Sequence, residues 1–176
     1  MDSRDVLRDT VLRLVLRDLA ALQREVTAYP DDESLWRIAP GITNSGGTLA
    51  LHLAGNLRGF IGSVLGGSEY VRDREREFTA TGLSRATVML ELADAQIEVM
   101  RALSTLDLAR LDAEYPQTLA ETHLRTDVFL MHLACHASYH LGQIDYHRRL
   151  ITGDSATAKT LSIPALVEPL PDYLSI

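Results

Sequence analysis

Four long segments of the chain repeat apolar residues at intervals of three and four, and this periodicity restricts the fold more than any other feature. The segments cover residues 2–28, 45–65, 84–106 and 126–152. Apolar residues at this spacing lie along one face of an α-helix, and no segment shows a competing strand pattern. The sequence therefore predicts an all-α protein, a four-helix bundle whose apolar faces meet in one core.

Residues that commonly begin or end helices stand at the edges of these segments. Asn44 or Ser45 is expected to cap the second helix, Ser84 the third and Thr126 the fourth. Gly153 is expected to end the fourth helix, because glycine readily adopts the left-handed conformation found after a helix.

The connections predict one domain with an extension. The region 107–125 is mixed in character and has the length of a long crossover rather than a tight hairpin. Residues 154–176 contain three prolines and cannot form one helix. We expect a helical-bundle domain over residues 1–153. The C-terminal extension carries apolar residues between Leu161 and Leu174, so we expect it to pack on the bundle or on a partner subunit.

Composition and charge exclude several classes of protein. A chain of 176 residues with 46% hydrophobic and 23% charged residues is ordinary for one soluble domain. A net charge of −7 offers no basic face for nucleic acid, and no apolar run is long enough for a signal peptide or a membrane span. The single cysteine, Cys135, excludes an intrachain disulfide and is typical of a reducing compartment, so we expect a cytoplasmic protein without nucleic-acid or membrane partners.

Two features between the helices have a structural and a functional interpretation. Residues 72–78 alternate in charge, which favours a solvated or salt-bridged surface, with a substrate-binding arginine as the alternative. Trp36 is the only tryptophan. It is interpreted as a lid over one end of the bundle, with direct contact to a ligand as the alternative.

The fourth segment carries His132, His136 and His140 at a spacing of four. Residues four apart on a helix lie one turn above each other, and two imidazoles so placed form half of a metal site. Each four-residue step drifts by about 40°, so all three cannot easily converge on one ion. The spacing therefore indicates one neighbouring pair and a third ligand from elsewhere, with packing or surface histidines as the alternative. Cys135 lies about 100° from His136 and is expected to be a small buried apolar residue.

The second segment offers the missing ligand. His52 and Asn56 lie one helical turn apart beside the apolar residues of that segment. A polar side chain in such surroundings must be hydrogen-bonded, ligated or at an edge, because unpaired burial costs about 1–3 kcal/mol. His52 is therefore the candidate third ligand.

Several motifs resemble those of the DinB-like superfamily, and in particular a branch known as a domain of unknown function. The resemblance covers the chain roughly from the first helix to Gly153. It is carried by the residues Pro40–Ser45, Leu51–Asn56, Arg72–Arg74 with Glu77-Phe78, and His136–Ile144.

This resemblance implies a dimeric four-helix bundle that binds a divalent metal through three histidines. Carried over by position, the ligands are His52, His136 and His140. The metal is expected to be zinc or nickel, with iron or manganese as alternatives, because three imidazoles accept all of these ions. The candidates for hydrogen bonding around the metal or for contact with substrate are His132, Asn56, Gln143 and Trp36.

Three functions are compatible with these residues. Relatives in the superfamily imply a transferase that joins a low-molecular-weight thiol, such as bacillithiol, to a small electrophile. A non-catalytic, stress-associated metal-binding or interaction protein is the first alternative. The second is a metal-dependent hydrolase, for which the histidine motifs supply no evident general base, since Asp145 is expected to face elsewhere.

Overall fold

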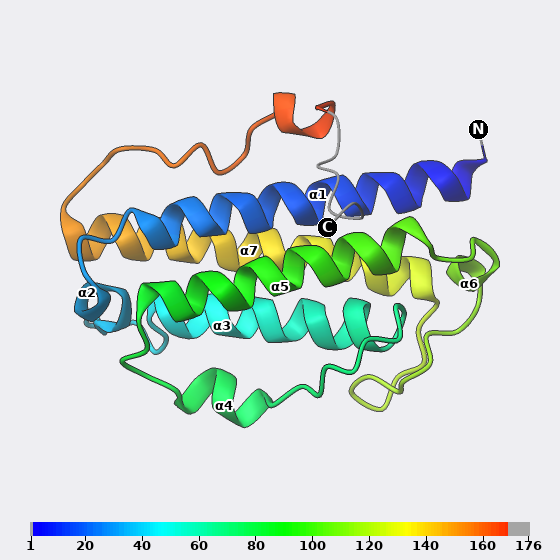
Figure 1. The fold of residues 1–176 in the computed structure, drawn as a ribbon, viewed down its shortest axis with the longest axis horizontal. Coiled ribbons are helices and arrows are strands. Elements are labelled where there is room, and N and C mark those ends of the chain that lie inside the picture. Colours follow the sequence, from blue (N-terminus) through cyan, green and yellow to red (C-terminus); the bar gives the residue numbers. More distant parts are fainter. Residues whose placement is uncertain (1, 169–176) are drawn as a thin grey trace.

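The computed structural model describes residues 2–168, in which four long helices lie side by side (Figure 1). The prediction of an all-α fold is confirmed, because residues 2–168 contain only two isolated β-bridges and no strand. The long helices are α1 (Ser3–Thr27), α3 (Gly46–Leu57), α5 (Arg85–Ser104) and α7 (Thr126–Thr152). A π-helical turn, η1 (Arg58–Ser63), extends α3, and the short helices are α2 (Asp32–Trp36), α4 (Arg74–Thr79), α6 (Ala109–Asp112) and η2 (Pro164–Leu166).

The four long helices form a square in which α1 and α3 each pack against both α5 and α7. Their apolar faces meet in one core, and the 3/4 spacing of the sequence accounts for which residues are buried. Asp18 interrupts the apolar face of α1 and is nevertheless buried. It accepts hydrogen bonds from Arg17 and from Ser138 of α7, so its carboxylate is paired and links two helices.

The crossover lies in a different place from the one that we predicted. α3 and α5 run in the same direction, because Gly47 lies near the start of α5 and Gly66 meets Ala102 near its end. The chain must therefore return along the molecule between them. It does so through residues 64–84, which carry α4 across the outside of α3 (Figure 1). Residues 107–125 stay at one end, where Tyr115 is buried and donates a hydrogen bond to the Phe60 carbonyl.

The predicted helix ends are largely confirmed. The Ser45 and Ser84 hydroxyls accept hydrogen bonds from the backbone N–H groups of Thr48 and Thr87, and Gly153 ends α7 with φ of 70°. The prediction for Thr126 is wrong. It is the first residue of α7 and is buried, and its N–H donates to the Ala113 carbonyl instead of its side chain capping the helix.

The short helices α2, α4 and α6, which lie within the connections, were not predicted from the sequence. α2 begins with a capping box between Asp31 and Ser34, and α4 begins where Asp73 accepts from the Arg76 N–H. Both are shorter than two turns, which is too short for hydrophobic periodicity to reveal them. Trp36 ends α2 and packs over Gly47, and its indole N–H donates to the Leu83 carbonyl at 2.7 Å.

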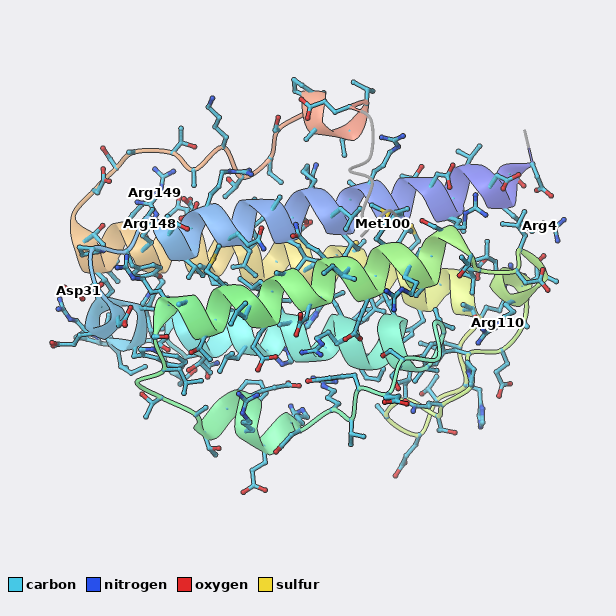
Figure 2. All side chains as sticks on the ribbon, viewed as in Figure 1. Arg4, Asp31, Met100, Arg110, Arg148 and Arg149 are labelled. Carbon is cyan, nitrogen blue, oxygen red and sulfur yellow. The ribbon has the colours of Figure 1, made fainter. Side chains whose placement is uncertain are left out.

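The C-terminal segment follows α1 as far as it is described. Arginine side chains hold its backbone carbonyls: Arg148, labelled in Figure 2, binds Ala156, Arg24 binds Ala158 and Arg13 binds Glu168. The contact is made by arginine side chains, whereas Leu161, Ile163 and Val167, on which the packing prediction rested, are exposed. The other apolar residues of the prediction, Leu170, Tyr173 and Leu174, lie outside the described residues. No helix within residues 2–168 combines the length and hydropathy needed to cross a membrane.

Candidate metal centre

Three histidines from two helices come together between α3 and α7. His52 extends from α3, and His136 and His140 extend from successive turns of α7. The Nε2 atom of His136 lies 3.4 Å from that of His52 and 3.0 Å from that of His140. The ligand atoms of all three lie within 4.8 Å of one another, which is the spacing of a group able to hold a metal ion.

The ring geometry fits a single ion. The three imidazole planes are nearly perpendicular to one another, at 86°, 89° and 90°. Nitrogens about 2.0–2.1 Å from a metal lie roughly 2.9–3.4 Å apart when their angles at the metal are about 90–110°. The two separations from His136 Nε2 fall in this range, and the ligand atoms of His52 and His140 lie within 4.8 Å of each other.

Hydrogen bonds on the far side of two rings fix which nitrogen is free. His52 Nδ1 donates to Glu77 Oε2 at 2.9 Å, and His140 Nδ1 donates to Gln143 Oε1 at 2.6 Å. Both Nε2 atoms therefore direct lone pairs toward His136. A neutral His136 has one proton and can satisfy only one of them, whereas a cation at the shared point accepts all three lone pairs. His136 Nδ1 is buried without a hydrogen-bond partner among the described residues.

Glu77 is the residue of the site that sequence analysis missed. Its carboxylate accepts from His52 and also from Arg72, at 2.7 and 2.8 Å, and it is 4% exposed. The predicted salt bridging of residues 72–78 is present in this pair, but the pair is largely buried against α3 and does not lie on a solvated surface. Carboxylates that accept from the second nitrogen of a ligating histidine orient the ring and raise its basicity. Glu77 thus prepares His52 to bind a cation.

Two glycines explain why the connector approaches α3 so closely. Gly55 and Gly59 lie one turn apart on α3 and η1, and a Cβ at Gly55 would overlap the Glu77 carboxylate. At Gly59 a Cβ would lie 3.0 Å from Arg72 Cδ. The glycines therefore form a smooth surface on which the Arg72–Glu77 pair lies. A glycine three residues after His52, followed by another four residues later, is the signal that could have indicated this contact.

The charges around Glu77 keep it ionised. Burial by itself would raise the pKa of the Glu77 carboxyl, but the hydrogen bonds from Arg72 and then from His52 outweigh it, and the pKa lies below its usual value. Glu77 is thus held as an anion by two donors. It balances positive charge near the histidines and is poorly suited to accept a proton from a substrate.

Two of the histidines are held in the neutral form that binds metals. Desolvation, followed by the neighbouring His140 and His52, lowers the pKa of His136 to about 4. Desolvation also lowers the pKa of His140, and its hydrogen bond to Gln143 opposes this effect. Because a protonated imidazole cannot ligate, these lowered pKa values keep the pair ready for a cation at neutral pH.

Of the other predicted site residues, Gln143 and His132 contact histidines of the site, and Asn56 and Trp36 form no hydrogen bond with them. Asn56 is buried one turn after His52, and its Oδ1 has no partner among the described residues. Gln143 is exposed and accepts from His140. His132 is exposed, which contradicts a position in the core, and its ring stacks between those of Phe129 and His136. Trp36 contacts the start of α3 and closes one end of the molecule.

Cys135 is not a buried apolar residue, as the sequence had suggested. It is exposed on α7, because the face of this helix at Cys135 turns away from the core. The helical geometry that directs Cys135 away from His136 holds, so the expectation that it is not a ligand remains. The residues next to the histidines in the sequence do not all face the core.

A cavity of about 440 Å³ lies about one helical turn from the site, and none of the three candidate ligands lines it. Gln143 connects the two, because it lines the cavity and accepts a hydrogen bond from His140. Asp, Glu, Lys and Arg are absent from the lining, and the volume is that of a site for a small molecule. The lining residues are 41–44, Leu49, Gln143, Tyr146, His147 and Leu150.

Replacing Glu77 with glutamine is expected to weaken metal affinity by about 10–100-fold, because the amide orients His52 without the negative charge that raises its basicity. Competition with a chromophoric chelator measures the change. Glu75→Gln is the matched control, because Glu75 is exposed on the same short helix and is expected to leave affinity unchanged. Equal affinities for the two variants would exclude a role for Glu77 at the site.

Acid is expected to destabilise the metal-free protein through His136. Its pKa is lowered from 6.5 to about 4 in the folded state, so between these values the unfolded chain binds protons that the folded chain does not. Stability should therefore fall as the pH falls through this window. Thermal unfolding in chelator at a series of pH values measures it, and His136→Gln should have a shallower dependence. The same slope in both proteins would contradict the assignment.

The fold and the site define an all-α protein with a candidate three-histidine metal centre. A sequence model of the family described as "Protein of unknown function (DUF1572)" matches residues 5–166, and the chain belongs to this family. The match continues past Gly153 into the segment that lies along α1. No curated protein and no solved structure matches the chain.

Proposed function

We propose that this protein is a divalent-metal-dependent enzyme that transfers a low-molecular-weight thiol to small electrophiles. The observation that carries the proposal is the convergence of three imidazole nitrogens from His52, His136 and His140. Three protein ligands leave a coordination position open, as in catalytic rather than structural zinc sites. Zinc and nickel are the first candidates for the ion, with iron and manganese as alternatives.

A bound divalent ion would supply a Lewis acid that lowers the pKa of a thiol and favours the thiolate at neutral pH. The histidines suit this task because imidazole is an uncharged ligand, so three of them leave the +2 charge of the ion uncompensated. The sulfur of the thiolate forms a bond to the electrophilic carbon. The leaving group departs with its electron pair, and the proton of the thiol passes to solvent.

The residues around the histidines have separate roles in this proposal. Glu77 holds His52 in the tautomer that presents Nε2, and Arg72 keeps Glu77 ionised. Gln143 fixes His140 in the same tautomer from the other helix. Asn56 offers a buried carbonyl oxygen that has no partner among residues 2–168 and can accept a hydrogen bond from a reactant.

The carboxylates favour thiol transfer over hydrolysis. A hydrolase needs a general base for water, and the two carboxylates nearest in the sequence motifs are already engaged. Glu77 is bound by Arg72 and His52, and Asp145 accepts from Arg148 and Arg149. A thiol needs no such base once its pKa is lowered.

The resemblance to the DinB-like superfamily supports the same class of reaction. The uncharged cavity beside Gln143 suits a neutral electrophile, and the single cysteine is compatible with a reducing cytoplasm, where such thiols are kept reduced. We also propose, as the resemblance implies, that the protein acts as a homodimer.

The test is metal analysis of untagged protein followed by a conjugation assay. Protein loaded with zinc, nickel, iron or manganese is incubated with bacillithiol and 1-chloro-2,4-dinitrobenzene, and thioether formation is followed by absorbance. We expect metal-dependent conjugation that is lost in His136→Ala. Stoichiometric metal without conjugation of any of several thiols would indicate a non-catalytic metal-binding protein instead.

A further inference from the structure

The outward face of α7 differs from an ordinary helix surface. Nine of its residues between positions 128 and 150 are exposed, and none is Asp, Glu, Lys or Arg. Five are large and apolar or aromatic, namely Val128, Met131, Tyr139, Tyr146 and Leu150, and are 40–78% exposed. At 100° per residue the nine positions lie within about 120° of the helix circumference. We call these nine exposed residues the α7 stripe.

A stripe of this width is typical of a helix face that packs against another helix. In α7 it lies opposite the face that already enters the core, so α7 has a packing surface on each side. Gly142 lies within the stripe, and no atom stands within 4 Å of the position of a Cβ there. A glycine inside a helix lowers helix propensity, and here it leaves room for a second backbone to approach closely.

We propose that a second copy of this chain packs along the α7 stripe. An isologous dimer pairs one surface with itself, and an uncharged stripe meets its own copy without repulsion. A standard stable interface buries about 800 Å² per partner, and the stripe offers five large side chains, 40–78% exposed, spread along about six turns of α7. Helices that lie on membranes have a face rich in Lys and Arg, whereas the flanks of this stripe carry Asp127 and Arg149 in a chain of net charge −7.

The second copy would also complete the site, a conclusion that rests on the proposed function. Tyr146 and Leu150 belong to the stripe and at the same time form the outer wall of the cavity beside Gln143. They are 78% and 61% exposed. Covering them turns an open groove into an enclosed pocket for a neutral electrophile, close to His140. The partner subunit thus supplies the missing wall.

Multi-angle light scattering at micromolar concentration, in chelator, tests the interface independently of the metal. We expect the wild-type protein to be dimeric. Gly142→Glu and Tyr146→Glu are each expected to weaken the dimer at least about 100-fold, because each buries an unpaired charge at its centre. Leu90→Glu on α5 is the matched control, since Leu90 is 67% exposed and lies outside the stripe. Circular dichroism verifies that each variant is folded.

Cys135 provides a second readout from within the stripe. Its thiol should react slowly with a maleimide in the wild-type dimer and rapidly in Gly142→Glu. A wild-type monomer, or a dimer that both stripe variants leave intact, would overturn the proposal. Binding of a monomeric wild-type protein to phosphatidylcholine vesicles would assign the stripe to a membrane surface instead. Because the protein is metal-free throughout, a failed metal site leaves these results unchanged.

Discussion

His52→Ala is expected to lower metal affinity by more than about 100-fold, because losing an imidazole ligand costs more than losing the residue that orients it. His52 alone comes from α3, so its removal leaves two ligands on one helix and no ligand across the groove. His136→Ala and His140→Ala should have effects of the same size. Isothermal titration of metal-free protein with zinc measures all three.

Two further alanine variants test the register of the site. His123→Ala is the control, because His123 is exposed in the connection before α7 and binds Glu114 at its surface. It should bind zinc as the wild type does. His132→Ala should weaken binding little, because this ring stacks against His136 without directing a nitrogen toward the other ligands. Loss of binding in His132→Ala with retention in His140→Ala would show that the ligand pair on α7 is His132 and His136, one turn earlier.

Arg148→Ala is expected to destabilise the protein by about 3–5 kcal/mol, because it leaves a buried carboxylate without its counter-ion. Arg148 and Glu25 are 1% and 0% exposed, and the guanidinium also binds the backbone carbonyls of Asp154 and Ala156. Burial raises the pKa of Glu25, and Arg148 opposes that shift. Urea unfolding measures the loss of free energy.

A neighbouring arginine provides a control that distinguishes the effect of burial from the effect of losing a charge. Arg149 is also paired with Asp145, but it is partly exposed, and Arg149→Ala should cost less than about 1 kcal/mol. Adding Glu25→Gln to Arg148→Ala should recover part of the loss, since the remaining group is then uncharged. If Arg148→Ala and Arg149→Ala have equal costs, the buried pair does not have the role assigned to it.

Local sequence signals predicted most of the fold. The 3/4 spacing predicted the four long helices, and Ser84 and Gly153 marked two of their ends. These local signals failed for segments whose structure depends on tertiary contacts. The short helix α4 has too few residues to show periodicity, and its position depends on the parallel direction of α3 and α5. Nothing in residues 64–84 alone reveals that these two helices run the same way.

The candidate site was likewise predictable only where local helix geometry determines it. The spacing of His136 and His140 follows from helix geometry, and His52 stood out as a polar residue beside an apolar face. Glu77 did not, because its burial requires the crossover to fold back over Gly55. Cys135 was predicted to be buried because its neighbours in the sequence are apolar. In the structure it belongs to the exposed, uncharged α7 stripe. A second packing face on one helix resembles a core face in the sequence.

X-ray absorption spectroscopy of zinc-loaded protein, prepared without an affinity tag, tests the three-histidine centre most directly. We expect one ion per chain, with three imidazole nitrogens at about 2.0–2.1 Å and oxygen or a bound thiol completing the shell. In protein prepared without added thiol there should be no sulfur ligand. A Cys135 sulfur at about 2.3 Å from the zinc, or fewer than three imidazoles around the ion, would contradict the three-histidine centre.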